Sequence, residues 1–130
     1  MTVSYGLAKK LKEAGIEVES TYFYSDTDKE FMHRGVRFQR PNEANAPMLH
    51  EILEVMPADI MPDNVGCYTL RLIKWNLSLD KKPIIKYHVN YYDERLDENL
   101  TNKAFENENP AEAAGQLLLW LGENNYLDKK

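Results

Sequence analysis

The chain has 130 residues, of which 43% are hydrophobic, and its formal net charge is −5. This length and composition argue against a disordered chain and predict a single folded domain, residues 1–130, with a core of its own. Cys67 is the only cysteine, which excludes an internal disulfide and disfavours an oxidised secreted scaffold. Residues 1–10 do not resemble a signal peptide, and no apolar run approaches the ~20 residues of a membrane span. We therefore expect a soluble, cytoplasmic protein that does not contact a membrane.

The negative charge is concentrated toward the C-terminus. Residues 93–130 carry four basic and nine acidic side chains, whereas residues 1–40 have a net charge of +1 and residues 41–92 of −1. An acidic surface repels phosphate groups, so this distribution disfavours non-specific binding to DNA or RNA. A solvated acidic loop that aids solubility is the simplest interpretation of the C-terminal charge.

The first predicted element is a helix that begins near Thr2 or Ser4 and ends at Ala14. Its apolar residues recur at spacings of three and four, which places them on one face of the helix. These residues are Val3, Leu7, Ala8, Leu11 and Ala14. Gly15 follows, and it can adopt the left-handed conformation that closes a helix.

Two short strands are expected next, at residues 17–24 and 36–40. The first is rich in β-branched and aromatic residues, and the second alternates with period two. We expect these strands to pair as a hairpin. A second helix is predicted over residues 45–56, with Pro47 in its first turn and Pro57 ending it.

The strongest strand pattern lies at residues 68–75 and 85–92, which alternate and are expected to form an antiparallel pair. Residues 93–109 are acidic and rich in Asn. We expect them to form a long loop with a short strand at residues 101–105.

The last helix is predicted to be capped by Asn109, with Pro110 at its first position and Glu112 placed to complete a capping box. It should end near Gly122, with residues 126–127 folding back onto the core. The element order α-β-β-α-β-β-α predicts an α+β fold. Its antiparallel sheet would have about four strands, with the three helices packed on one face.

Three stretches together resemble a known group of sequences. They are LAKKLKEAG at 7–15, APMLHEILE at 46–54 followed by Met56-Pro57, and NPAEAA at 109–114 leading into LLWL and ENNYL. This succession resembles small uncharacterised proteins of bacteriophages and prophages, including those of gut bacteria. The resemblance implies a phage or prophage context, and hence the host cytoplasm, with no known activity and no functional residue. Met48 departs from the expected Thr, so we expect the capping box to Glu51 to be lost.

No catalytic or cofactor-binding motif is present. The glycines are too scattered for a phosphate-binding loop or a dinucleotide fingerprint, and no Gly-x-Ser-x-Gly motif occurs. Cys67 and His88 could in principle form a thiol–imidazole pair, but a lone cysteine at a strand start is more typical of a packing residue. A metal site formed by His33 with Asp26 or Asp28 lacks paired ligand spacing. We therefore expect no metal, no cofactor and no catalytic residue.

The best candidate site is the face of the sheet opposite its apolar side. If the apolar residues of the paired strands pack inward, the other face combines the aromatic, basic and aliphatic side chains that interface centres favour. The inward set is Tyr68, Leu70, Leu72, Ile85, Tyr87, Val89 and Tyr91. The outward set, predicted to bind a partner, is Arg71, Ile73, Trp75, Lys86, His88 and Tyr92. Such a face could be a second core layer, a surface for another protein or a second copy, or a platform for single-stranded nucleic acid.

The leading hypothesis is a non-enzymatic, phage-type accessory protein that works through protein–protein contact, with a homodimer as one form. Trp75, Ile73 and Tyr92 would then be buried against the partner, with Arg71 and Lys86 at the rim. Two other classes stay open, a nucleic-acid-associated protein that uses the same face and an enzyme with an unrecognised site.

The acidic segment 93–109 is an alternative contact, for a basic partner or as a mimic of nucleic-acid charge. High salt would abolish binding through this segment, whereas an apolar contact centred on Trp75 would survive it.

Overall fold

The computed structural model describes residues 2–20, 22–25, 31–33, 43–62, 66–76, 84–103 and 105–127. Its helices are α1 (Tyr5–Glu13), α2 (Leu49–Val55) and α3 (Pro110–Glu123). Its strands are β1 (Tyr22–Ser25), β2 (Phe31–His33), β3 (Glu43–Asn45), β4 (Asp59–Ile60), β5 (Tyr68–Asn76), β6 (Ile85–Asp93), β7 (Glu98–Asn99) and β8 (Glu106–Asn107).

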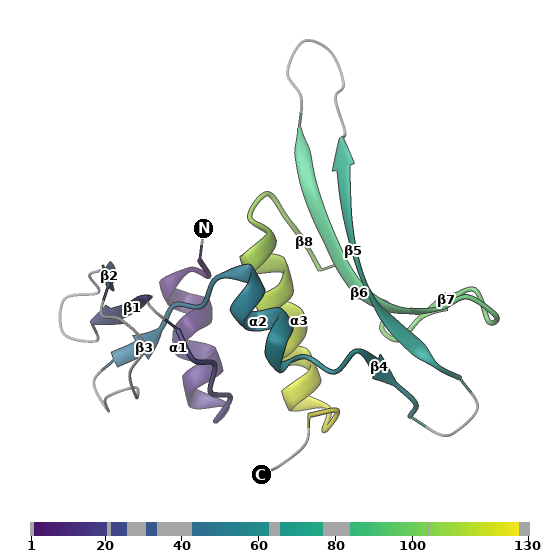
Figure 1. The fold of residues 1–130 in the computed structure, drawn as a ribbon, viewed down its shortest axis with the longest axis horizontal. Coiled ribbons are helices and arrows are strands. Elements are labelled where there is room, and N and C mark those ends of the chain that lie inside the picture. Colours follow the sequence, from purple (N-terminus) through teal and green to yellow (C-terminus); the bar gives the residue numbers. More distant parts are fainter. Residues whose placement is uncertain are drawn as a thin grey trace.

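The elements are arranged side by side, with the helices between two antiparallel sheets (Figure 1). The smaller sheet has the order β2-β1-β3 and lies beside α1. The larger sheet has the order β4-β5-β6-β7, and β8 also pairs with β6. Helix α3 packs against α1, α2 and β6, which makes it the centre of the fold. The fold is therefore α+β, as the sequence predicts.

Helix α1 begins and ends with the expected local chemistry. The side chain of Ser4 accepts a hydrogen bond from the Leu7 amide at 3.4 Å, and Gly15 adopts a φ of 75°. A positive φ strains any residue with a side chain, so glycine suits this position. The predicted helix start near Ser4 and the closing Gly15 are confirmed.

Helix α3 also begins as predicted, at Asn109, whose side chain accepts from the Ala111 amide at 3.0 Å. The prediction that Glu112 completes a capping box within α3 is wrong. The carboxylate of Glu112 instead accepts from the backbone amide of Ser4 at 2.8 Å and from its hydroxyl at 2.7 Å. The first turn of α3 thereby holds the first turn of α1, 108 residues away.

The second helix is shorter than predicted, because it begins at Leu49 and not at residue 45. The preceding residues are extended and hydrogen-bond to other strands, for example from the Ala46 amide to the Tyr22 carbonyl at 2.9 Å. The prediction that the capping box is lost is wrong for one of its two hydrogen bonds, the one that the carboxylate of Glu51 accepts. The Glu51 side chain accepts from the Met48 amide at 2.8 Å, although Met48 supplies no hydroxyl.

The first predicted strand also changes its bounds. The strand predicted at residues 17–24 begins only at Tyr22, where β1 starts, and β1 pairs with β2 and β3. Just before β1, the Ser20 hydroxyl donates to the Ala46 carbonyl at 3.0 Å and accepts from the Tyr22 amide at 3.1 Å. Such a side-chain bond competes with a strand ladder, so the ladder begins later. The predicted strand at residues 36–40 lies outside the described residues.

The acidic segment, residues 93–109, contains more strand structure than the predicted long loop. Instead of one strand at residues 101–105, two short strands, β7 and β8, flank that stretch and pair with β6. Between them the Thr101 hydroxyl accepts from the Lys103 amide at 3.1 Å, which turns the chain.

Candidate functional site

The ladder between β5 and β6 places the six predicted partner-binding residues on one face of the sheet. Cross-strand partners point to the same side, and the register pairs Ile73 with His88 and Trp75 with Lys86. Alternation along each strand adds Arg71 and Tyr92 to the same side. We call this side the outer face, defined by Arg71, Ile73, Trp75, Lys86, His88 and Tyr92.

The opposite side of the sheet faces the helices. Tyr68, Val89 and Tyr91 are buried there in the same core cluster as the apolar residues of α3. Because α3 lies on this side, no helix of the described ranges lies over the outer face. The sequence-based grouping into an inward and an outward set is therefore reproduced by the register.

An aromatic pair forms the arm end of the outer face, near the last pair of the β5–β6 ladder. The Trp75 and His88 rings are stacked, with centroids 5.4 Å apart and planes 9° from parallel. Trp75 remains 39% exposed, whereas the side chain of His88 is only 16% exposed. The indole is thus held in place by the imidazole beneath it and still presents a surface to a partner.

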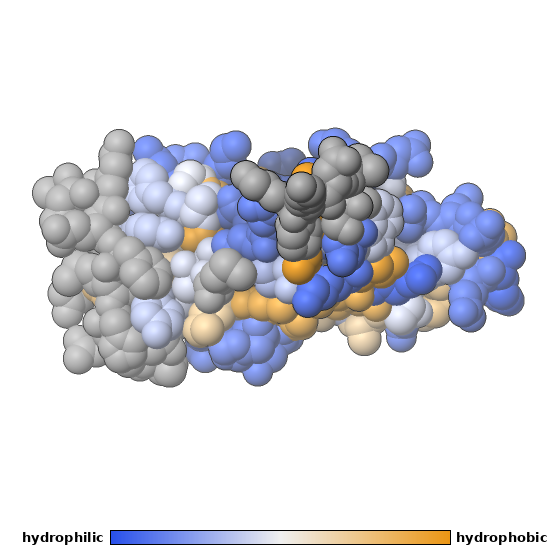
Figure 2. Space-filling view, turned by 90° about the horizontal axis from the view of Figure 1, so that it is seen from above, coloured by the Kyte–Doolittle hydropathy of each residue, from blue (hydrophilic) through white to orange (hydrophobic). Residues whose placement is uncertain are grey.

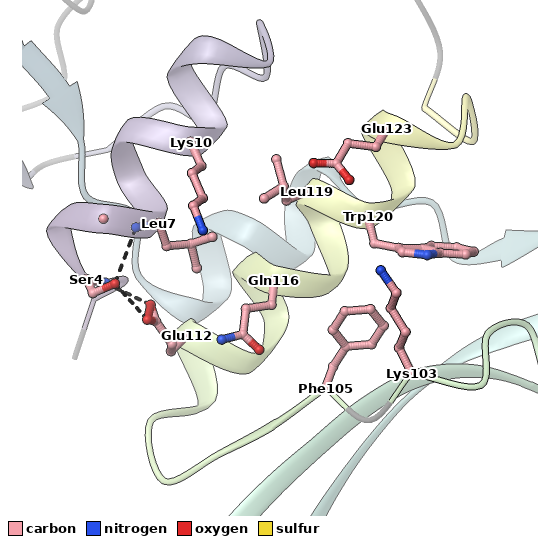
Figure 3. Close-up of a pocket in the computed structure, with 11 residues that line it drawn as sticks. Ser4, Leu7, Lys10, Lys103, Phe105, Glu112, Gln116, Leu119, Trp120 and Glu123 are labelled. Atoms are coloured by element: carbon pink, nitrogen blue, oxygen red, sulfur yellow. Dashed lines mark hydrogen bonds between the residues drawn. The ribbon is translucent and has the colours of Figure 1, made fainter.

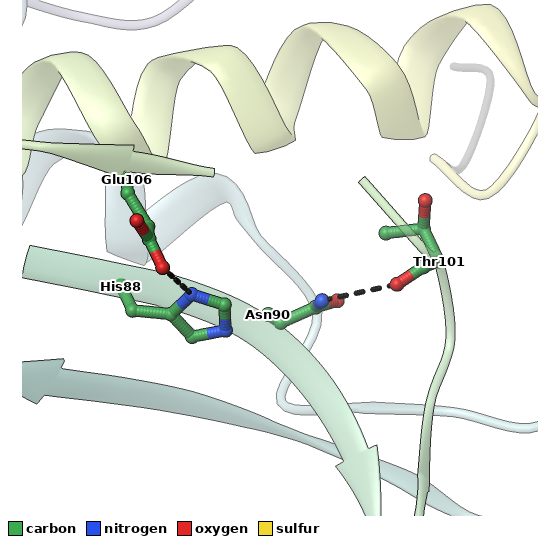
Figure 4. A network of polar contacts seen from close by, with 4 residues as sticks. All are labelled: His88, Asn90, Thr101 and Glu106. Carbon is green, nitrogen blue, oxygen red and sulfur yellow. Dashed lines mark hydrogen bonds and ion pairs between the residues drawn. The ribbon is translucent and has the colours of Figure 1, made fainter. Parts of the chain in front are cut away.

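His88 also borders the acidic segment, as Figure 4 shows. Its Nδ1 lies 3.4 Å from Oε1 of Glu106, without the geometry of a hydrogen bond.

A second pair forms the other end of the outer face. The Arg71 guanidinium lies over the Tyr92 ring, 4.4 Å from its centroid, in cation–π geometry. The Tyr92 hydroxyl hydrogen-bonds to the Asp97 carboxylate, and this bond raises the pKa of the Tyr92 hydroxyl. Tyr92 is therefore a neutral platform that fixes the position of Arg71.

Asn90 lies between these two pairs and was not among the predicted residues. It is buried, its side chain donates to the Thr101 carbonyl at 3.2 Å, and it accepts from the Tyr91 amide (Figure 4). A polar residue in the middle of an alternating strand is the sequence signal that could have identified it. Its role is to anchor the segment after β7 along β6, which fixes the edge of the outer face.

The upper end of the hairpin rises beyond the helices in Figure 1, and we call residues 71–76 and 84–88 the arm. Here the prediction of an inward set fails for two residues, because Leu72 is 41% and Ile85 37% exposed. They point to the helix side, but the helices do not reach them. Figure 2 looks down on this end and shows a band of hydrophobic surface beside it, whereas the β7 end is hydrophilic.

Charge is segregated between the hairpin and the rest of the chain. Residues 66–92 contain five basic and one acidic side chain, a net charge of +4, and the remaining residues contain eleven and twenty, a net charge of −9. The described stretches 66–76 and 84–92 contain no Asp or Glu. The arm is therefore basic, in contrast to the rest of the chain.

The other sites considered from the sequence do not assemble. Cys67 lies beyond the Tyr68 end of β5, whereas His88 pairs with Ile73, so about 17 Å of strand separates that end from the imidazole. Within the described ranges, no group of three His, Cys, Asp or Glu side chains could hold a metal ion. The proposed ligands Asp26 and Asp28 lie outside those ranges.

A groove of about 660 Å³ lies between α1, α3 and the segment before β8 (Figure 3). None of the predicted site residues lines it. Both oxygens of its Glu112 carboxylate accept hydrogen bonds from Ser4.

Comparison of the chain with protein-family models, curated proteins and solved structures finds no match. The resemblance to phage proteins therefore stays a prediction. None of the described helices has the length and hydropathy that crossing a membrane requires.

Proposed function

We propose that this chain is a non-enzymatic accessory protein, of the phage or prophage type, that acts by binding a protein partner through the outer face. The observation that carries the proposal is the partly exposed Trp75, stacked on His88 on a face that no described helix covers. Trp, Tyr and Arg are the residues enriched at the energetic centres of interfaces. All three types occur together on this face.

The charge pattern supports an acidic partner. Arg71 and Lys86 lie on the outer face, and Lys74 lies on the other side of the arm. Basic groups at the rim of a contact mainly raise the association rate, whereas a buried aromatic centre mainly slows dissociation. We therefore expect capture of the partner to weaken with salt but not to disappear.

The test is affinity capture from a host-cell lysate with the native chain, with Trp75→Ala and with Leu96→Ala as a matched control. Leu96 is 45% exposed and lies in the turn before β7, at the end of the hairpin opposite to Trp75. A partner retained by the native chain and by Leu96→Ala, but lost with Trp75→Ala, supports the proposal. Equal loss with both variants, or loss only when the acids of residues 93–109 are neutralised, refutes it.

The segregated positive charge favours one second candidate, a nucleic-acid-associated protein that uses the same face. A projecting two-stranded ribbon fits the major groove of DNA, and aromatic side chains can stack on unpaired bases. In this case Trp75→Ala would weaken oligonucleotide binding by ~1–3 kcal/mol. Fluorescence anisotropy with a single-stranded and a duplex oligonucleotide tests this, and failure to bind either at low salt removes the candidate.

A further inference from the structure

We infer that the arm pairs with a second copy of this chain through the free edge of β5, with Ile73 on the two-fold axis. This dimer rests on the proposed function and deepens it. The second copy would be one partner of the arm, and the outer faces of the two copies would join into one surface. Three features of β5 support this pairing. Its backbone groups point toward a free edge, two copies can adopt few registers along that edge, and one of these registers brings compatible side chains together.

The outer edge of β5 carries backbone groups that point away from β6. The Leu70 amide donates to the Ala58 carbonyl at 3.1 Å, so Leu70 directs its backbone groups toward β4. In an antiparallel strand these directions alternate, and therefore Leu72 and Lys74 direct their N–H and C=O groups to the same edge. On the partner strand, the Val89 amide donates to the Phe105 carbonyl at 3.1 Å, away from β5, which agrees with this assignment.

Strand β4 reaches only the first two residues of β5, Tyr68 and Thr69. Beyond Leu70, no strand of the described residues pairs with this edge. An unpaired edge with exposed apolar side chains is a template for pairing with another chain. Leu72 and Trp75, 41% and 39% exposed, supply such side chains on the two sides of this edge.

Two copies that pair antiparallel about a two-fold axis have few possible registers. Placing Leu72 opposite itself would require the edge groups of Leu70, which β4 already uses. Placing Lys74 opposite itself would bring two like charges together, which destabilises a cross-strand pair. The register between these two puts Leu72 opposite Lys74 of the second copy, and it avoids both conflicts.

The same register gives favourable pairs on the outer face. Ile73 lies opposite Ile73 of the second copy, and Arg71 lies opposite its Trp75, a cation–π combination. The two outer faces then form one continuous surface with both Trp75–His88 stacks on it. On the helix side, the aliphatic stem of Lys74 can cover the exposed Leu72 of the other copy.

Salt separates this contact from binding to an acidic partner. Two basic arms repel each other, so the dimer should become stronger as salt screens the charges. Contact of a basic arm with an acidic protein should become weaker under the same change. The two interactions can therefore be measured independently on one protein.

Cysteine cross-linking in a Cys67→Ser background tests the register. Residues that face each other as a non-hydrogen-bonded antiparallel pair have Cα atoms ~4.5 Å apart, within the disulfide range. With oxidised glutathione, Ile73→Cys should form a covalent dimer. Arg71→Cys and Trp75→Cys should cross-link when mixed but not alone, because each position lies ~14 Å from its own copy along the strand. Thr69→Cys is the control that should remain monomeric.

Sedimentation velocity of the native chain supplies the second measurement. Lys74→Pro removes an edge-facing amide that β6 does not use, so it should abolish the dimer without breaking the hairpin. The native chain should approach twice its monomer mass of 15.1 kDa with rising concentration, and Lys74→Pro should not. Equal dimerisation of both, a monomeric native chain, or cross-linking of Thr69→Cys in place of Ile73→Cys would overturn the inference. If the native chain is monomeric and Trp75→Ala still loses its captured partner, the proposed function survives without the dimer.

Discussion

The two ends of the β5–β6 hairpin share one alternating pattern and have different surroundings. At the lower end, Val89 and Tyr91 are completely buried beneath α3. At the upper end, Leu72 and Ile85 point to the same side of the sheet and are more than one third exposed. Alternation therefore assigns a residue to a face, whereas the length and position of the covering helix decide whether that face is buried.

The largest effect should come from matched leucine truncations in the two regions. Leu118→Ala removes a fully buried side chain of α3 and should lower the free energy of unfolding by ~2–5 kcal/mol. Leu72→Ala removes a side chain that is 41% exposed and should lower it by less than ~1 kcal/mol. Urea denaturation measures both values, and equal losses would show that the arm is as well packed as the body.

Two helical glycines provide the next test, because alanine should have opposite effects at the two sites. A Cβ on Gly115 would lie 2.8 Å from Cδ2 of Leu7 and 2.9 Å from Cγ1 of Val3, whereas a Cβ on Gly6 would meet nothing within 4 Å. Gly115→Ala should therefore destabilise the protein by ~1–3 kcal/mol through overpacking between α1 and α3.

Gly6→Ala is the control for this pair, since it should gain up to ~1 kcal/mol from helix propensity. Thermal unfolding of the two variants gives the comparison. A stabilising Gly115→Ala would show that α1 can move away from α3 at little cost, contrary to a tightly packed body.

A smaller effect is expected at the cap that joins the two ends of the chain. Glu112→Ala removes both hydrogen bonds to Ser4 and should cost ~0.5–2 kcal/mol, as the loss of other helix caps does. A double-mutant cycle with Ser4→Ala should give less than the sum of the two single losses, because the partners share one interaction. Additive losses would mean that the two residues act separately.

The smallest effect should be a pH dependence at the lower end of the hairpin. The buried Asp93 carboxylate accepts from the backbone amides of Leu96, Cys67 and Arg95, and these bonds hold its pKa below the usual range. A depressed pKa in the folded state stabilises the fold above the unfolded pKa of ~4, and this contribution is lost as pH falls through the folded value.

Denaturation at pH 7 and at pH 3 should therefore show that Asp93→Asn is less destabilising in acid, because the stability that comes from the depressed pKa of Asp93 begins to be lost once the pH falls below the unfolded pKa. Glu94→Gln, an exposed neighbour, should show no such convergence. If the deficit of Asp93→Asn is the same at both pH values, the Asp93 carboxylate does not contribute in its charged form.

The local features of this protein can be predicted from its sequence alone. The cap at Ser4, the closing Gly15 and the Asn109–Pro110 start of α3 follow from side-chain and backbone geometry within a few residues. Period-two alternation also grouped the outer face correctly, because the two sides of a strand are fixed by the backbone alone. The class of the fold followed from the order of these elements.

Other features of the fold depend on contacts between segments that are distant in the sequence. Glu112 caps α1 instead of its own helix, and residues 46–48 extend because β1 and the start of the chain lie beside them. Asn90 is buried because the segment after β7 crosses it, and Leu72 is exposed because α3 does not reach it. Each of these outcomes depends on a contact between residues far apart in the chain, and the local pattern of a single sequence carries no information about which distant segment will supply it.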